Sequence, residues 1–142
     1  MSTDKPATPV RRIHHINFIY RNLEHAVAIF ERALKLGPFE FDELPERGVR
    51  TARVQVGETF LVIVSPANDE GAPARYLEAH GEGFFLLSFE VDDLGKALEQ
   101  LDHPDAAVLV SQSRRGLDGW HVTDVPIELP GILVQLTDPA RK

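Results

Sequence analysis

Residues 15–20 alternate between two kinds of side chain, as a β-strand does when its two faces meet different surroundings. One face carries His15, Asn17 and Ile19, and the other carries Ile16, Phe18 and Tyr20. From Asn22 onward the apolar spacing becomes helical, and an asparagine before such a stripe is a favoured helix cap. The pattern therefore predicts a strand followed by a helix over residues 23–34, which covers the more apolar face of a sheet.

The strand-helix pattern of residues 12–27 returns at residues 85–98. Positions 15 and 86, 17 and 88, and 22 and 93 are each 71 residues apart, half of the 142-residue chain. An internal duplication is the simplest explanation of a constant offset. We therefore predict an α+β fold made of two βαβββ modules.

Three further strands are predicted in each module, and a helix connects the two modules. The predicted strands cover residues 39–42, 49–56, 60–64, 107–110, 120–125 and 132–137, and the helix covers residues 73–80. Residues 111–119 are polar and are predicted to form a loop over a pocket mouth.

One domain is expected over residues 11–142, after a flexible arm at residues 1–10. Within this domain, module one spans about residues 12–66, the linker helix region 67–83 and module two about residues 84–139.

The composition excludes several classes of function. A net charge of −7 argues against a face that binds nucleic acid or an anionic membrane, because either would need clustered positive charge. The absence of cysteine excludes disulfides and thiolate metal sites. No apolar run has the length of a membrane span or the character of a signal core, so a cytoplasmic location is expected.

Four short stretches carry a resemblance to a known family. They are His15-Ile16 leading to Asn22-Leu23-Glu24, then Glu46-Arg47-Gly48-Val49-Arg50, then residues 76–83 (YLEAHGEG), and residues 88–94 (SFEVDDL). In this order and spacing the sequence resembles the vicinal oxygen chelate (VOC) superfamily of glyoxalase, bleomycin-resistance and extradiol-dioxygenase-like proteins. The methylmalonyl-CoA epimerase branch is the nearest to it.

The resemblance implies that the two modules form a curled mixed sheet, a cup covered by helices, whose concave face holds the site. It also implies a homodimer. In metal-dependent members, four side chains in the cup bind a divalent cation, and those positions fall at His15, Val62, Leu86 and Gln135. Val62 and Leu86 have no lone pair, so only His15 and Gln135 remain of the metal site. We therefore expect no cofactor, and a weakly bound divalent metal is the alternative.

Two catalytic residues are expected from the resemblance. Glu46, in a Glu-x-Gly-Val turn, matches a family acid/base position. His15 is open to three functional readings, a ligand remnant, a general base or a hydrogen-bonding group, and also to a purely structural one. Gln135 stands where the epimerase branch has a second glutamate, and an amide cannot take a proton.

The substrate-binding set is expected to combine apolar and polar side chains that face the cup. Its members are Asn17, Arg53, Phe60, Val62, Leu86, Ser88, Leu133 and Gln135. A buried guanidinium needs a partner, so Arg53 is expected to meet Glu46, Glu90, or a carboxylate or phosphate of the substrate. His14 is expected to point away from the cup because it alternates with His15.

Two classes of function remain open, and both involve a small-molecule partner. The first is an isomerase, epimerase or lyase that acts beside a carbonyl or on an acyl thioester. The second is a metal-free module that binds or sequesters an apolar ligand. The polar residues Glu46, His15, Asn17 and Arg53 favour the enzyme, because a hydrophobic trap does not require them.

Overall fold

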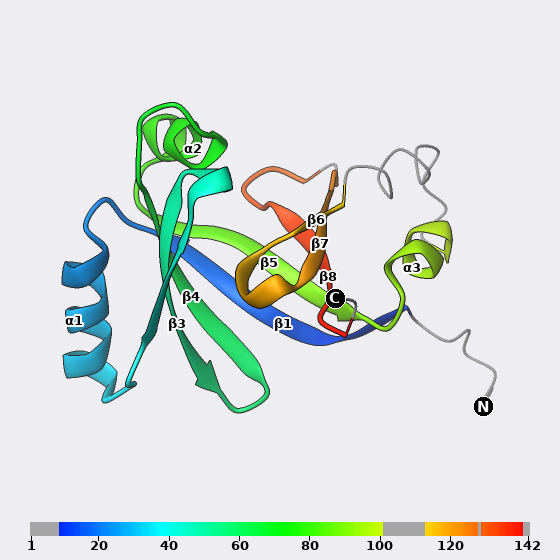
Figure 1. Cartoon of the computed structure of the whole chain (residues 1–142), viewed down its shortest axis with the longest axis horizontal. Coiled ribbons are helices and arrows are strands. Elements are labelled where there is room, and N and C mark those ends of the chain that lie inside the picture. The colour runs from blue at the N-terminus through cyan, green and yellow to red at the C-terminus, as the bar shows by residue number, and fades with distance from the viewer. Residues whose placement is uncertain (1–8, 101–112, 128, 141–142) are drawn as a thin grey trace.

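The computed structural model describes residues 9–100, 113–127 and 129–140, which form one mixed sheet flanked by helices (Figure 1). The strands are β1 (Val10–Ile19), β2 (Glu40–Leu44), β3 (Val49–Val56), β4 (Thr59–Pro66), β5 (Gly83–Val91), β6 (Arg114–Arg115), β7 (His121–Val125) and β8 (Val134–Asp138). The helices are α1 (Leu23–Leu34), α2 (Ala72–His80) and α3 (Leu94–Gln100), with short 3-10 helices η1 (Pro45–Arg47) and η2 (Leu117–Gly119). No helix in these ranges is long and apolar enough to cross a membrane.

The order of the described strands repeats around the middle of the sheet. It reads β2-β3-β4-β1-β5-β8-β7-β6. β1 pairs with β4 in parallel, β5 pairs with β8 in parallel, and β1 and β5 meet antiparallel at the centre. Each half of the sheet therefore has the same plan from the centre outward. The two-module α+β fold and the curled mixed sheet expected from the sequence are confirmed.

The segment before β7 differs from the prediction of a polar loop. Arg114 and Arg115 pair with Val122 and His121 as the short edge strand β6. The chain turns back through η2, where the amide of Gly116 donates to the carbonyl of Trp120 at 2.7 Å. This return is what allows residues 114–115 to pair with β7. The strand predicted at residues 107–110 lies outside the described residues.

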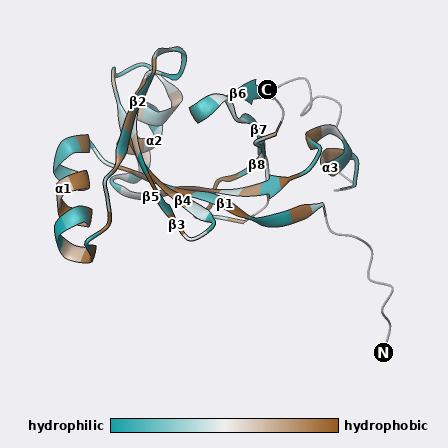
Figure 2. Ribbon diagram, turned by 60° about the horizontal axis from the view of Figure 1, so that its bottom comes forward, coloured by the Kyte–Doolittle hydropathy of each residue, from teal (hydrophilic) through white to brown (hydrophobic). Residues whose placement is uncertain are grey.

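Helices α1 and α3 cover the outer face of the sheet. The side chain of Asn22 caps α1 by accepting from the amide of His25 at 2.9 Å, as the sequence predicts. Helix α1 buries Leu23, Ala26 and Val27 against Phe39, Ala52, Val54 and Ile63. Helix α3 buries Leu94, Ala97 and Leu98 against Val91, Val125 and Leu136. Figure 2 shows the sheet curling away from these helices, so its other face is the inside of the cup.

A β-bulge interrupts the alternation of β1. The register against β5 shifts between Ile13 and His15, and such a shift turns the extra residue toward the face of its neighbour. His14 is only 2% exposed and its Nδ1 lies 2.8 Å from Nδ1 of His15. The expectation that His14 points away from the cup is therefore wrong, because it assumed an uninterrupted strand.

Candidate functional site

A small cavity lies on the concave face, between the two halves of the sheet. Its volume is about 60 Å³, and we call it the central cavity. Five of the residues proposed from the sequence line it, namely His15, Asn17, Val62, Leu86 and Gln135. Its other lining residues include Thr51, Val64, Leu117, Trp120 and Val122. The cavity is thus an apolar pocket with a few polar groups in its wall, as small-molecule sites usually are.

The four positions that the resemblance implies for a metal all line this cavity, but their side chains do not form a metal site. Val62 and Leu86 offer no donor atom, and Gln135 offers a neutral amide whose Nε2 donates to Asp124 Oδ1 at 3.4 Å. Nδ1 of His15 is already bonded to His14. Among the described residues, no three His, Cys, Asp or Glu side chains lie together as metal ligands would. The donor set does not fit a divalent cation.

His14 and His15 form a buried pair of neutral imidazoles. Their Nδ1 atoms are 2.8 Å apart, so one Nδ1 carries the proton and the other accepts it. Burial lowers the pKa of His15 to about 3, assisted by His14, while a hydrogen bond with Gln135 has the opposite effect. Burial also lowers the pKa of His14 to about 4, opposed by the charge of Glu90. An imidazole with so low a pKa is a poor proton acceptor at neutral pH. A hydrogen-bonding role for His15 is therefore favoured over the role of a general base.

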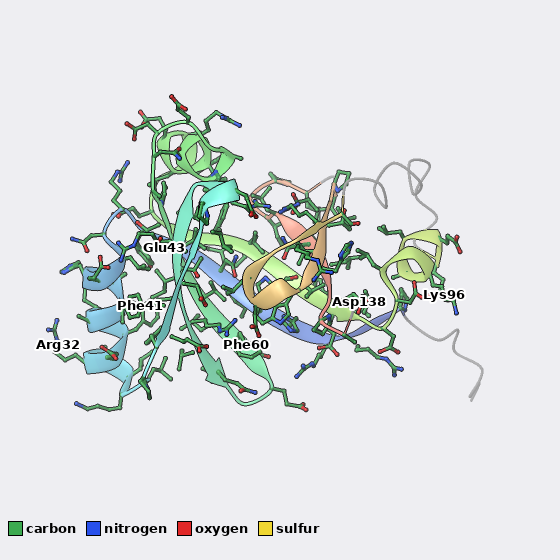
Figure 3. All side chains as sticks on the ribbon, viewed as in Figure 1. Arg32, Phe41, Glu43, Phe60, Lys96 and Asp138 are labelled. Carbon is green, nitrogen blue, oxygen red and sulfur yellow. The ribbon has the colours of Figure 1, made fainter. Side chains whose placement is uncertain are left out.

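Trp120 packs against this histidine pair, and the sequence reasoning did not single it out. It is 6% exposed and stacks on His15 with ring centroids 5.2 Å apart. It meets His14 edge-on at 4.4 Å and Phe60 at 5.2 Å. Phe60 is labelled on β4 in Figure 3. The one available signal was that Trp120 is the only tryptophan of the chain.

Arg53 lies against the same aromatic group and has different partners from those expected. Its Nη2 lies 2.7 Å from Glu40 Oε2, and its Nη1 lies 3.7 Å from Asp118 Oδ2. Glu40 is its cross-strand neighbour on β2, whereas Glu90 is paired with Arg12. The pairing with Glu46 or Glu90 is therefore wrong. The guanidinium carbon also lies 5.5 Å from the Trp120 ring, within range of a cation–π interaction.

The remaining proposed residues lie away from the central cavity. Ser88 is fully buried with its hydroxyl hydrogen-bonded to that of Thr137. Leu133 is 44% exposed and lines a groove of about 760 Å³ between α2 and β8. This groove adjoins the central cavity, because Leu86 lines both spaces.

Glu46 is exposed on η1, beside the opening of the cup. It lines a second, wider hollow of about 660 Å³, which we call the outer hollow. Arg47, Pro73 and Arg114 line both the outer hollow and the central cavity. The two spaces are therefore adjacent, and Glu46 lies in the wall of the outer one.

A short chain of polar groups joins the cavity to its rim. Gln135 bonds to His15 on one side and to Asp124 on the other. Asp124 also accepts from Nη1 of Arg114 at 3.2 Å. Asp124 and Gln135 are direct cross-strand partners on β7 and β8, which explains why their side chains meet. The amide of Gln135 is thus held between a neutral imidazole and a paired carboxylate.

Two known enzymes are similar to this chain in sequence. The chain is 26% identical over 133 residues to the mitochondrial methylmalonyl-CoA epimerase of Bos taurus, covering 92% of this chain and 76% of that protein. The human enzyme is 27% identical over 127 residues, covering 88% of this chain and 72% of that protein.

Two solved structures are similar in fold. A methylmalonyl-CoA epimerase in complex with methylmalonyl-CoA and NH4+ has a TM-score of 0.81 at 25% identity, covering 93% of this chain and 96% of that chain. A variant of the Streptomyces coelicolor epimerase in complex with 2-nitronate-propionyl-CoA has a TM-score of 0.80 at 26% identity, with the same coverage. The family profile described as the Glyoxalase/Bleomycin resistance protein/Dioxygenase superfamily matches residues 14–123, more than half of the chain. The chain therefore belongs to the Glyoxalase/Bleomycin resistance protein/Dioxygenase superfamily.

Proposed function

We propose that this protein binds a compact acyl thioester of the coenzyme A type in the cup and catalyses proton transfer at the carbon beside the thioester carbonyl. The reaction class is that of an isomerase, epimerase or lyase. The observation that carries the proposal is the adjacency of the central cavity and the outer hollow, which share Arg47, Pro73 and Arg114, together with the position of Glu46 in the lining of the outer hollow. The similarity to epimerases solved with CoA thioesters supports the choice of ligand.

In this proposal Glu46 is the proton-transfer group. Its carboxylate takes a proton from the carbon beside the carbonyl, and the C–H electron pair moves to form an enolate with the negative charge on the carbonyl oxygen. Return of a proton to the carbon restores the thioester. Gln135 takes no part in the transfer, because an amide is neither an acid nor a base at neutral pH. The protein therefore has one acid/base residue where an epimerase mechanism with two glutamates has a pair.

A metal is not assigned a step in this mechanism. The four inherited positions lack the donors to hold a divalent cation, so the enolate oxygen must be stabilised by hydrogen-bond donors in the cup.

A second function is a module that binds an apolar ligand without turnover. The small volume and largely apolar lining of the central cavity favour it, as does the exposure of Glu46. Such a module needs neither Glu46 nor a thioester. The two functions therefore differ in the ligand that they select and in their dependence on Glu46.

A thermal-shift and calorimetric panel separates the two. Acyl-CoA thioesters, free coenzyme A, 2-oxo acids and aromatic compounds are compared as ligands, because a ligand that binds only the folded state raises its melting temperature. The proposal expects propionyl-CoA to bind at least tenfold more tightly than free coenzyme A. Tight binding of an aromatic compound, with no preference for the acyl group, contradicts the enzyme and supports the binding module.

A further inference from the structure

Three buried polar atoms in the wall of the central cavity have no hydrogen-bond partner within the described part of the protein. They are Oδ1 of Asn17, Oγ1 of Thr51 and Nε of Arg114. All three residues line the same cavity. Leaving one buried donor or acceptor unpaired costs about 1–3 kcal/mol, so three at one place require an explanation. A bound ligand whose polar groups hydrogen-bond to these three atoms would explain them.

These atoms come from separate elements and differ in their hydrogen-bonding character. Thr51 on β3 is 2% exposed, and its hydroxyl can donate or accept. Nε of Arg114, on β6, is a donor like every guanidinium nitrogen, and it is left over because Nη1 and Nη2 bond to Asp124. Oδ1 of Asn17 on β1 is an acceptor. The wall thus offers two donors for a ligand oxygen and one acceptor for a ligand O–H.

The electrostatics of the cavity favour a neutral head group. The charge of Arg114 is compensated by Asp124 at 3.2 Å. His14, His15 and Gln135 are neutral at pH 7, so none of them balances a buried carboxylate. The remaining cation in the lining, Arg47, is on η1 and also borders both wider spaces, so it belongs to the opening. A hydroxyl group avoids the desolvation cost that a carboxylate would meet here.

We infer that Asn17, Thr51 and Arg114 form a binding subsite for a hydroxyacyl head group. The thioester carbonyl oxygen accepts from Thr51 and Arg114, and the hydroxyl of the acyl group donates to Asn17. This inference rests on the proposed function and deepens it by naming the class of acyl group. The same two donors stabilise the negative charge that develops on the carbonyl oxygen, which is the task that a metal performs in other members of the family.

The test compares ligands that differ in one substituent. Dissociation constants are measured by calorimetry for propionyl-CoA, 2-hydroxypropionyl-CoA, 3-hydroxypropionyl-CoA and methylmalonyl-CoA. The inference expects at least one hydroxy derivative to bind about tenfold more tightly than propionyl-CoA. It also expects methylmalonyl-CoA, which adds a carboxylate, to bind more weakly than that derivative.

Each outcome of this comparison has one meaning. If no thioester binds more tightly than free coenzyme A, the proposed function itself fails. If propionyl-CoA binds as well as both hydroxy derivatives, the function stands but the subsite does not, and the three polar atoms hold only water. If methylmalonyl-CoA binds most tightly, the cavity recognises a carboxylate and the inference is wrong.

Two variants test which side chain binds the hydroxyl group and which binds the carbonyl oxygen. Asn17→Leu should abolish the preference, so that the hydroxy derivative binds no more tightly than propionyl-CoA does to the same variant. Thr51→Val should weaken all the thioesters about tenfold without destabilising the free protein, because its hydroxyl makes no hydrogen bond there. Thr137→Val is the matched control. Its hydroxyl is also buried but is bonded to Ser88, so the variant should lose stability and keep its affinity. The reverse pattern would overturn the assignment of Thr51.

Discussion

Nδ1 of His14 and Nδ1 of His15 lie 2.8 Å apart although the two residues are adjacent on one strand. Alternation would place them on opposite faces, and the bulge in β1 brings both into the cup. There they contact Trp120 from two directions. The floor of the site is therefore a buried aromatic cluster in which one Nδ1 must lack a proton to accept the hydrogen bond, and in which burial disfavours the charged form of both imidazoles.

The stability of the protein should fall as the pH is lowered from 7 to 5. The folded-state pKa values of His14 and His15 are about 4 and about 3, below the unfolded value of 6.5, so the unfolded chain binds more protons in this range. The free energy of unfolding has its full value above pH 6.5 and decreases as the pH falls toward 4. Two such groups together lose on the order of 3 kcal/mol between pH 7 and pH 5.

Urea unfolding at the two pH values measures this loss. The double variant His14→Gln, His15→Gln should lack most of it, whereas His25→Gln, which changes an exposed histidine on α1, should retain it. Equal pH dependence in all three proteins would mean that the pair titrates normally.

Purified protein should contain no stoichiometric divalent metal, because Val62 and Leu86 cannot ligate one. Since all four inherited positions line one cavity, the triple variant Val62→Glu, Leu86→His, Gln135→Glu should gain measurable Co²⁺ or Zn²⁺ affinity. Elemental analysis of the natural protein and Co²⁺ absorption spectra of the variant give the two readouts. One equivalent of metal that is lost in His15→Ala would refute the first expectation. A folded triple variant without metal affinity would refute the placement of the four positions.

Arg53→Met should destabilise the fold by about 1–2 kcal/mol. The substitution keeps the aliphatic packing but removes the ion pair with Glu40 and the contact with Trp120, and the Arg53 side chain is only 11% exposed. Arg50→Met is the matched control, because Arg50 pairs with Glu24 at the surface and its loss should destabilise the fold less. Equal losses in urea unfolding would show that the aromatic contact contributes nothing.

A homodimer is expected, because the sheet has two ends and exposed apolar side chains. Strand β2 is one end, and Phe41 on it is 48% exposed (Figure 3). Sedimentation at micromolar concentration should give twice the chain mass of 15.8 kDa. A single monomeric species would count against the expectation.

The fold was predictable because the strand-helix pattern occurs twice in the chain. The alternation at residues 15–20 and the helix cap at Asn22 each have a counterpart in the second half, which reinforces weak local signals. The position of His14 was not predictable, because a bulge shifts one side chain to the other face without changing the composition of the strand.

The polar wall of the cavity was only partly predictable. Asn17 follows from alternation on β1, and Thr51 shares a face with Arg53 on β3 but shows no signal of its own. Arg114 enters the site because the chain turns back at η2 and pairs β6 with β7, a contact that local sequence does not encode. For the same reason Glu40 was missed as the partner of Arg53, since the register of β2 against β3 decides that pairing.

In the proposed reaction, Glu46 transfers a proton at the carbon beside a thioester carbonyl. Incubation of propionyl-CoA with the protein in D₂O, followed by proton NMR, measures exchange at that carbon directly. The natural protein and Glu43→Gln, a neighbouring exposed glutamate on β2, should exchange at similar rates, and Glu46→Gln should be slower by about 10²-fold or more at unchanged affinity. If the natural protein binds propionyl-CoA without exchange, or if exchange is equally fast in Glu46→Gln, Glu46 is not the proton-transfer group.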